Sequence, residues 1–180
     1  DPLMRENFII ELKEICKSKE ITILLATHEK NIAFAHADQL VMMQFGQIEQ
    51  VGNPIELKLQ PKNIFIAQMM DHQNLITAKL VKDSLYQFPW GEMHLKNAPK
   101  KEFVLVSIPI EAMTIGPAGD FEFEPKNVYF RGHFYEVLFN VGETERKTWM
   151  NIQEFKSLKS NNKAHLSFRP EHFIYLDCLS

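Results

Sequence analysis

Apolar positions follow two different periods along the chain, and the change falls near residue 70. Before it, apolar side chains recur at intervals of three and four residues or form one short apolar run, as in helices and a buried strand. After it, short apolar segments alternate with turn residues, as in a series of strands. The pattern predicts two domains, residues 1–70 and 74–178, with the boundary in the polar residues between Met70 and Asn74.

An unbroken apolar run at residues 21–26 is the central feature of the first domain. Its length and its β-branched residues predict a strand that is covered on both faces of a parallel sheet. An amphipathic helix is expected before it at 3–17, with Asp1 as its cap and Pro2 at its first position. His28 follows the run directly, at the end of the strand where ligands bind in open α/β sheets. The alternative for His28 is that it only caps the next short helix.

A hairpin and two helices are expected after that short helix. Residues 39–45 and 47–51 are largely apolar or alternating on either side of Gly46, which predicts two strands and a tight turn. Asn53 and Pro54 then give the cap and first position of a helix. A further helical segment is expected at 64–70, and the first domain therefore mixes helices with strands.

The second domain is expected to be built from strands. Eight short strands are predicted, at 75–81, 85–90, 103–108, 127–130, 135–141, 147–150, 165–168 and 173–176. Turn residues separate them, and strands at this spacing are typical of a small β-barrel or sandwich. One or two helical turns are expected at 152–158.

Two segments of the second domain repeat one another. FVLVSIPIEAMTI at 103–115 and AHLSFRPEHFIYL at 164–176 align without gaps, so that Pro109 corresponds to Pro170. Proline lacks the N–H that a strand ladder needs, so each copy predicts a strand that ends at the proline, a turn and a second short strand.

Composition adds constraints on partners and location. The net charge of -3 gives no reason to expect a nucleic-acid partner, since phosphate binding requires clustered positive charge. The ring side chains Phe88, Trp90, Phe130, Phe134, Tyr135 and Phe139 are expected to pack in the core rather than to stack on bases. Cys16 and Cys178 lack metal or redox spacing and are expected to be reduced thiols. No apolar run approaches ~18 residues and no signal peptide is recognised, so any membrane role is expected to pass through a partner.

The region around His28 resembles a known family. The positions that carry the resemblance are Thr27-His28-Glu29, Ala33, Ala37-Asp38, Leu40, Met43, Gly46, Ile48, Gly52 and Pro54. They resemble the switch-histidine region of ATP-binding-cassette (ABC) ATPases. In the second domain, Arg169-Pro170-Glu171 and residues 130–142 resemble the TOBE domain, an oligomer-binding-fold barrel of importer ATPases. The first copy of the repeat departs from that pattern, with Ile108 and Ile110 where arginine and glutamate are usual.

The resemblance implies a fold class and roles for two residues. The fold is expected to be the α/β remnant of a P-loop ABC ATPase domain followed by an all-β OB-like (TOBE) barrel. His28 is expected to contact the γ-phosphate of ATP. Asp1 is expected to be the last residue of the D-loop, which crosses to a partner ATPase. By the same resemblance, ATP and Mg²⁺ are expected to be the cofactors of the full-length parent, which is expected to be an ATP-hydrolysing enzyme of importers of the kind that move polyamines, sulfate, iron or maltose.

The chain contains no phosphate-cradling glycine loop with its lysine, no signature motif and no Walker B carboxylate. The resemblance therefore implies a carboxy-terminal fragment that is inactive alone and binds no cofactor. The expected partners are a second ATPase subunit in a homodimer, membrane permease subunits and, indirectly, a solute-binding protein, on the cytoplasmic face of the membrane. Two alternatives stay open: a stand-alone regulatory module that binds a small ligand or protein, and an autonomous hydrolase that uses His28.

Overall fold

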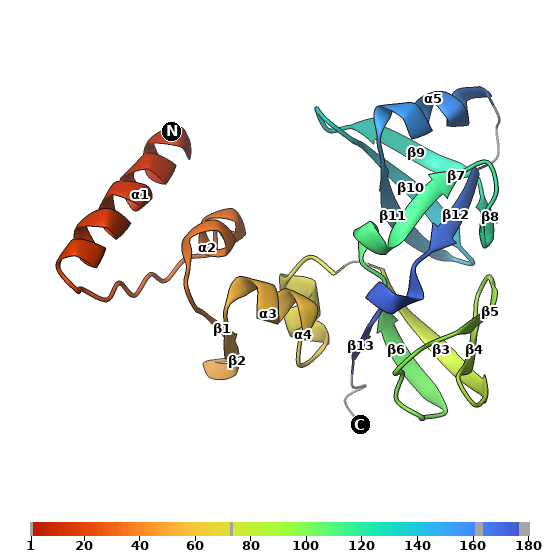
Figure 1. Cartoon of the computed structure of the whole chain (residues 1–180), viewed down its shortest axis with the longest axis horizontal. Helices are drawn as coiled ribbons and strands as arrows, with labels where there is room; N and C mark the ends of the chain where they lie inside the picture. Colours follow the sequence, from red (N-terminus) through yellow and green to blue (C-terminus); the bar gives the residue numbers. More distant parts are fainter. Residues whose placement is uncertain (1, 73, 161–163, 177–180) are drawn as a thin grey trace. The chain divides into compact units, whose positions relative to one another are not determined.

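A computed structural model describes residues 2–72, 74–160 and 164–176 (Figure 1). The chain divides into two compact units, an amino-terminal unit, Asp1–Leu59, and a β unit, Gln60–Ser180. Each is described by itself below. The domain boundary between Met70 and Asn74 stays a prediction. Among the described residues, no helix is both long enough and apolar enough to cross a membrane.

The amino-terminal unit contains three helices and one hairpin within the residues described. The elements are α1 (Pro2–Ser18), α2 (Lys30–His36), β1 (Leu40–Gln44), β2 (Gln47–Gly52) and α3 (Pro54–Leu59). Strands β1 and β2 pair in antiparallel fashion around Phe45 and Gly46, whose φ angles are 49° and 78°. Glycine accepts such an angle without cost, so the predicted turn is confirmed.

Helix α3 begins where the sequence predicts it, through reciprocal contacts of Asn53 and Glu56. The Glu56 N–H donates to Asn53 Oδ1 (2.9 Å), and the Asn53 N–H donates to Glu56 Oε2 (3.1 Å). These two bonds satisfy backbone donors that a helix start leaves without intrahelical partners.

The predicted buried strand at 21–26 is wrong. Residues 21–27 adopt neither helix nor strand, and the side chains of Ile21, Ile23, Leu24 and Leu25 are exposed, Leu24 to 94%. A strand is stable only where neighbouring strands pair with its backbone N–H and C=O groups. In the described part of the unit, β1 and β2 pair only with each other, so residues 21–26 have no sheet to join.

The β unit is made mainly of strands. Its elements are α4 (Ile64–Met69), β3 (Leu75–Lys82), β4 (Leu85–Phe88), β5 (Gly91–His94), β6 (Phe103–Ser107), η1 (Ile110–Ala112), β7 (Met113–Gly116), β8 (Phe121–Phe123), β9 (Pro125–Phe130), β10 (Tyr135–Val141), β11 (Thr144–Met150), α5 (Ile152–Ser160), β12 (Ala164–Phe168), η2 (Pro170–His172) and β13 (Ile174–Leu176). All eight predicted strands are confirmed, with small shifts at their ends.

Three antiparallel sheets organise the described strands of the β unit (Figure 1). Their strand orders are β13-β6-β3-β4-β5, β7-β12-β8 and β11-β10-β9. The buried core between them includes Val106, Val137, Leu166 and Phe173. Alternation of buried and exposed residues along β10, for example, places Val137, Phe139 and Val141 in this core.

The two copies of the sequence repeat exchange their second strands. The first copy forms β6, η1 and β7, and the second forms β12, η2 and β13, which confirms the predicted strand, turn and strand. Strand β6 pairs with β13, and β12 pairs with β7. Ser107 faces Ile174, and the equivalent residues Phe168 and Met113 face each other. The copies are therefore held together by equivalent pairings.

Candidate functional site

His28 lies in a bend between residues 21–27, which form neither helix nor strand, and α2, and its side chain is exposed. Helix α2 begins at Lys30, and its N-cap position is Glu29. His28 is thus one residue too early to be that cap. Within the described residues, the His28 imidazole has no hydrogen-bond or ion-pair partner. Its ring nitrogens are accessible to a ligand from outside the unit.

The backbone around His28 is ordered by its two neighbours. The Glu29 N–H donates to Thr27 Oγ1 (3.0 Å), which closes a short turn across His28. The carboxylate of Glu29 accepts a hydrogen bond from the Arg5 guanidinium of α1 (2.8 Å). The turn and the ion pair together hold the position of His28 without using its side chain.

Helix α2 is bound to α1 at its carboxy-terminal end. Lys13 Nζ donates to the His36 carbonyl oxygen (2.6 Å) and lies 3.6 Å from Asp38 Oδ1. A cation near the last carbonyls of a helix is electrostatically favourable. Asp1, the other site residue expected from the sequence, lies outside the described residues.

The fit of the amino-terminal unit to ATP and Mg²⁺ is limited to one contact. An exposed imidazole can donate a hydrogen bond to a phosphate oxygen. Magnesium requires oxygen ligands, mainly carboxylates and waters, in octahedral geometry. No group of three or more His, Cys, Asp or Glu side chains suited to a metal occurs in the part of the chain that is described. His28 is therefore suited to contact a phosphate group, and the described residues do not form a magnesium site.

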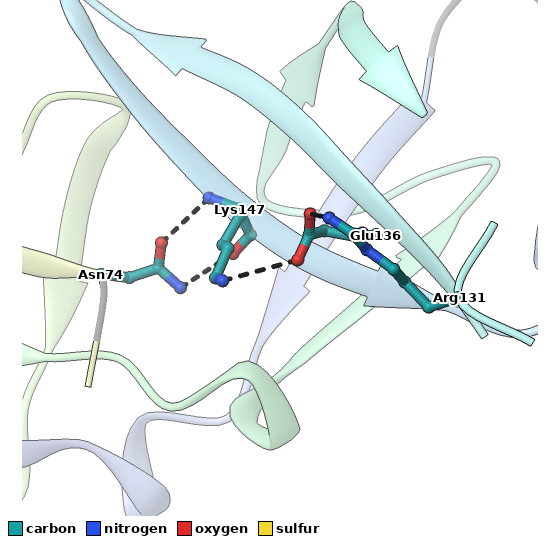
Figure 2. A network of polar contacts seen from close by, with 4 residues as sticks. All are labelled: Asn74, Arg131, Glu136 and Lys147. Atoms are coloured by element: carbon teal, nitrogen blue, oxygen red, sulfur yellow. Dashed lines mark hydrogen bonds and ion pairs between the residues drawn. The ribbon is translucent and has the colours of Figure 1, made fainter. Parts of the chain in front are cut away.

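A second polar site, in the β unit, joins the start of β3 to β11 and β10 (Figure 2). Asn74 Nδ2 donates to the Lys147 carbonyl oxygen (2.9 Å), and the Lys147 N–H donates to Asn74 Oδ1 (3.2 Å). Lys147 Nζ lies 3.5 Å from Glu136 Oε2, and Arg131 donates to Glu136 Oε1 at 2.7 Å. The hydrogen bond from Arg131, with the charge of Lys147, holds the pKa of Glu136 below its usual value although burial opposes this.

Aromatic side chains surround Glu136 on the same face of its sheet. Tyr129 and Trp149 are its cross-strand neighbours on β9 and β11, and both are partly exposed. The Arg131 guanidinium lies 5.5 Å from the centre of the Tyr129 ring. The Phe134 ring packs at 4.6 Å from that of Trp149. The arrangement combines an ion pair with a partly exposed aromatic surface.

The expectation that ring side chains of this unit pack in the core is confirmed for only some of them. Phe88 and Phe139 are buried. For Phe130 the prediction is wrong, because its side chain is 61% exposed. It is the last residue of β9, an outer strand of its sheet, and its ring lies 5.1 Å from that of Tyr135.

Arg169, in the second copy of the repeat, is hydrogen-bonded to the first copy. Its N–H donates to the Ala112 carbonyl oxygen (2.9 Å), and its guanidinium donates to the Glu111 carbonyl oxygen. At the equivalent place in the first copy, the Ile108 N–H donates to the Asn74 carbonyl oxygen (2.9 Å). The polar role of Arg169 is thus structural here, and Ile108 offers no matching side chain.

Sequence reasoning did not identify Asn74, Glu136 or Lys147 as interacting residues. Asn74 and Lys147 are 73 positions apart, and Glu136 meets Arg131 only because of the turn between β9 and β10. No local pattern of residues signals such contacts. The turn residues expected between the predicted strands 127–130 and 135–141 were the available hint, since this turn brings the side chain of Arg131 back over its own hairpin.

Comparisons with known proteins identify related sequences. No protein-family model matches the chain. It is 30% identical over 175 residues to the spermidine/putrescine import ATP-binding protein PotA of Aster yellows witches'-broom phytoplasma, covering 95% of this chain and 41% of that protein. The PotA of Desulfitobacterium hafniense is 30% identical over 147 residues, 79% of this chain and 42% of the relative.

A relative with a different named solute also matches. The Fe(3+) ions import ATP-binding protein FbpC of Streptomyces avermitilis is 34% identical over 93 residues, which cover 52% of this chain and 27% of that protein. The chain thus spans about two fifths of the length of the two PotA relatives, 41% and 42%. Each of these relatives is named as an import ATP-binding protein, and the names differ in what is imported.

Proposed function

This chain belongs to the import ATP-binding proteins of ABC transporters, and we propose that it is the carboxy-terminal part of a subunit that couples ATP binding and hydrolysis to solute uptake through membrane permeases. The observation that carries the proposal is the match to a PotA import protein along 95% of the chain. The relatives are named for spermidine/putrescine and for Fe(3+), so the proposal covers the import reaction and not one solute.

His28 is assigned the γ-phosphate contact in this proposal. Its support is the exposed imidazole, held in place by its neighbours and without a partner in the described unit. A hydrogen bond from the ring to the γ-phosphate would strengthen as negative charge grows in the transition state of phosphoryl transfer. Asp1 is assigned the end of the D-loop that faces the partner ATPase. ATP and Mg²⁺ are assigned to the complete subunit, and neither is assigned to this chain alone.

The domain assignment forms a separate part of the proposal. Residues 1–70 would close the ABC ATPase domain, and residues 74–178 would form a TOBE domain, an OB-like barrel with a regulatory or dimer-contact role. The hairpin β1–β2 with its following helices supports the first assignment. The antiparallel strands of the β unit support the second, as does the exchange of second strands between the two copies of the repeat.

The proposed partners follow from the import role. They are a second copy of the ATPase subunit, membrane permease subunits and, through these, a solute-binding protein. The subunit would be cytoplasmic and would reach the membrane through the permeases. No nucleic acid is among the proposed partners.

ATP hydrolysis by the 180-residue chain, measured beside that of the complete subunit, tests this function. We expect turnover by the complete subunit and none by the chain, with weak nucleotide affinity at most, because the glycine loop and the Walker B carboxylate carry most of the ATP contacts. Turnover by the chain alone would instead identify an autonomous hydrolase that uses His28.

A further inference from the structure

Two of the polar residues that follow α4, His72 and Asn74, are buried, although the sequence predicts a boundary between domains there. The exposed fraction is 5% for His72 and 2% for Asn74. A flexible linker exposes its polar groups to water, whereas buried polar groups are stable only when they are hydrogen-bonded. The partners of these two residues therefore decide how α4 is connected to the strands that follow.

His72 connects the end of α4 to β6. Its N–H donates to the Ala67 carbonyl oxygen of α4 (2.9 Å). Its ring nitrogen Nδ1 lies 2.6 Å from the Ser107 hydroxyl oxygen, at the end of β6. Ser107 is completely buried, so water cannot replace this bond if it is lost.

Asn74 makes the connections to a second sheet. Its side chain binds the backbone of Lys147 on β11, as Figure 2 shows, and Nδ2 also lies 3.4 Å from the Ile108 carbonyl oxygen. The Ile108 N–H donates to the Asn74 carbonyl oxygen (2.9 Å). One asparagine thus bridges the end of β6 and the middle of β11, which belong to different sheets.

Helix α4 is also fixed at its start and along its length. Asn63 is buried, and its side chain accepts a hydrogen bond from the Ile66 N–H (2.9 Å). Ile66, Ala67 and Met70 are almost completely buried. A short helix has little stability of its own, so this packing keeps α4 folded.

We propose that His72 and Asn74 form a latch that makes α4 and the strands of the β unit one rigid body. The boundary at which the amino-terminal unit can move independently of the β unit then lies before Asn63, and not between Met70 and Asn74. Any motion that reaches α4 is passed to the β6 sheet through Ser107 and to β11 through Lys147. This inference goes beyond the proposed function, because the division at residues 70–74 concerns the family domain to which each segment is assigned, whereas the latch concerns which segments move together.

Hydrogen exchange of the full 180-residue chain, together with a matched pair of variants, tests the latch. Ser107→Ala removes the hydroxyl that binds His72. Ser84→Ala is the control, because it removes the same group from an exposed serine–histidine pair, in which Ser84 Oγ lies 3.1 Å from His94 Nδ1. The probes are the amides of Met70 and His72, which bond within α4, and the amide of Val137 in β10.

In the wild-type chain, the Met70 and His72 amides should be protected together with the β unit, and limited proteolysis should cut before Asn63 and not at residues 71–74. Ser107→Ala should raise the exchange rate of these two amides on the order of tenfold, the effect of losing one buried hydrogen bond, with little change at Val137. Ser84→Ala should change neither.

Three results would overturn the latch. The first is rapid exchange of Met70 and His72 in the wild-type chain while Val137 stays protected, or preferred cleavage at 71–74. The second is an unchanged rate in Ser107→Ala. The third is an equal acceleration at Val137, which would mean that the variant weakens the whole unit. The first result needs no variant, so the proposal remains falsifiable even if Ser107→Ala does not fold.

Discussion

Asn74 binds both backbone polar groups of Lys147 through its side-chain amide. The NH₂ group donates to the carbonyl oxygen (2.9 Å), and Oδ1 accepts from the N–H (3.2 Å). Lys147 lies on β11, an outer strand of the β11-β10-β9 sheet. The amide therefore replaces a neighbouring strand at this position and satisfies two groups that would otherwise lack partners.

Replacing Asn74 with alanine should destabilise the chain by about 1–3 kcal/mol, the usual cost of leaving buried polar groups without partners. Asn140→Ala is the control, because Asn140 is exposed on β10, and it should change the free energy of unfolding by less than about 0.5 kcal/mol. Urea unfolding of both variants measures the difference. Equal effects would show that the Asn74 amide contributes no more than a surface side chain.

The ion pairs of Glu136 predict a dependence of stability on pH. Because its hydrogen bond from Arg131 lowers its pKa, the folded chain binds fewer protons at this carboxyl than the unfolded chain does. The stability that results is present above the unfolded pKa of about 4.3 and is lost as the pH falls through the lower, folded pKa.

Glu136→Gln should therefore lower the free energy of unfolding at pH 7, by up to about 1 kcal/mol for a partly exposed network, and should flatten its decline in acid. Glu143→Gln, at an exposed position in the turn between β10 and β11, is the matched change. Urea unfolding from pH 7 to pH 3 compares them. The same acid decline in all three proteins would contradict the assignment.

The repeat predicts different costs for equivalent leucines. Leu166 is fully buried, whereas Leu105, its counterpart in the first copy, is only partly buried. Leu166→Ala should cost about 2–5 kcal/mol because it leaves a cavity in the core. Leu105→Ala should cost clearly less. Thermal unfolding of the two variants measures these costs. A larger loss of stability in Leu105→Ala would contradict the prediction that Leu166 contributes more to the core than Leu105.

The exposed apolar surface of the amino-terminal unit predicts association of the chain in solution. Val41 faces Val51 and Met43 faces Ile48 on one side of the hairpin, and all four are largely exposed. Apolar surfaces of this kind favour association. Sedimentation should show concentration-dependent self-association that the double variant M43K/I48E weakens and that Val81→Glu, in the β unit, leaves unchanged. A monomer at all concentrations would refute this.

The local elements of both units could be predicted from the sequence because their signals are local. Gly46 allows the turn of the hairpin, Asn53 caps α3, and alternation of apolar residues marks the strand β10. The repeat in the sequence also predicted the strand, turn and strand of each copy. Each of these features depends on residues within a few positions of one another.

Features that depend on distant partners could not be predicted. The run 21–26 has the composition of a buried strand, but composition does not supply the neighbouring strands that such a segment needs. The exchange of strands between the two copies requires their register, which the alignment does not contain. At the candidate site, the position of His28 after an apolar segment was predictable, whereas the lack of a hydrogen-bond or ion-pair partner for its imidazole among the described residues was not.

The central claim is that His28 stabilises the transition state of ATP hydrolysis, and steady-state hydrolysis measured beside nucleotide binding in the complete subunit tests it most directly. His28→Ala should retain ATP binding and lose roughly 10²-fold in turnover, the scale for removing one preorganised stabilising group. Glu29→Ala and His36→Ala, in the same segment, should cost much less. Turnover at the wild-type rate in His28→Ala would contradict the claim.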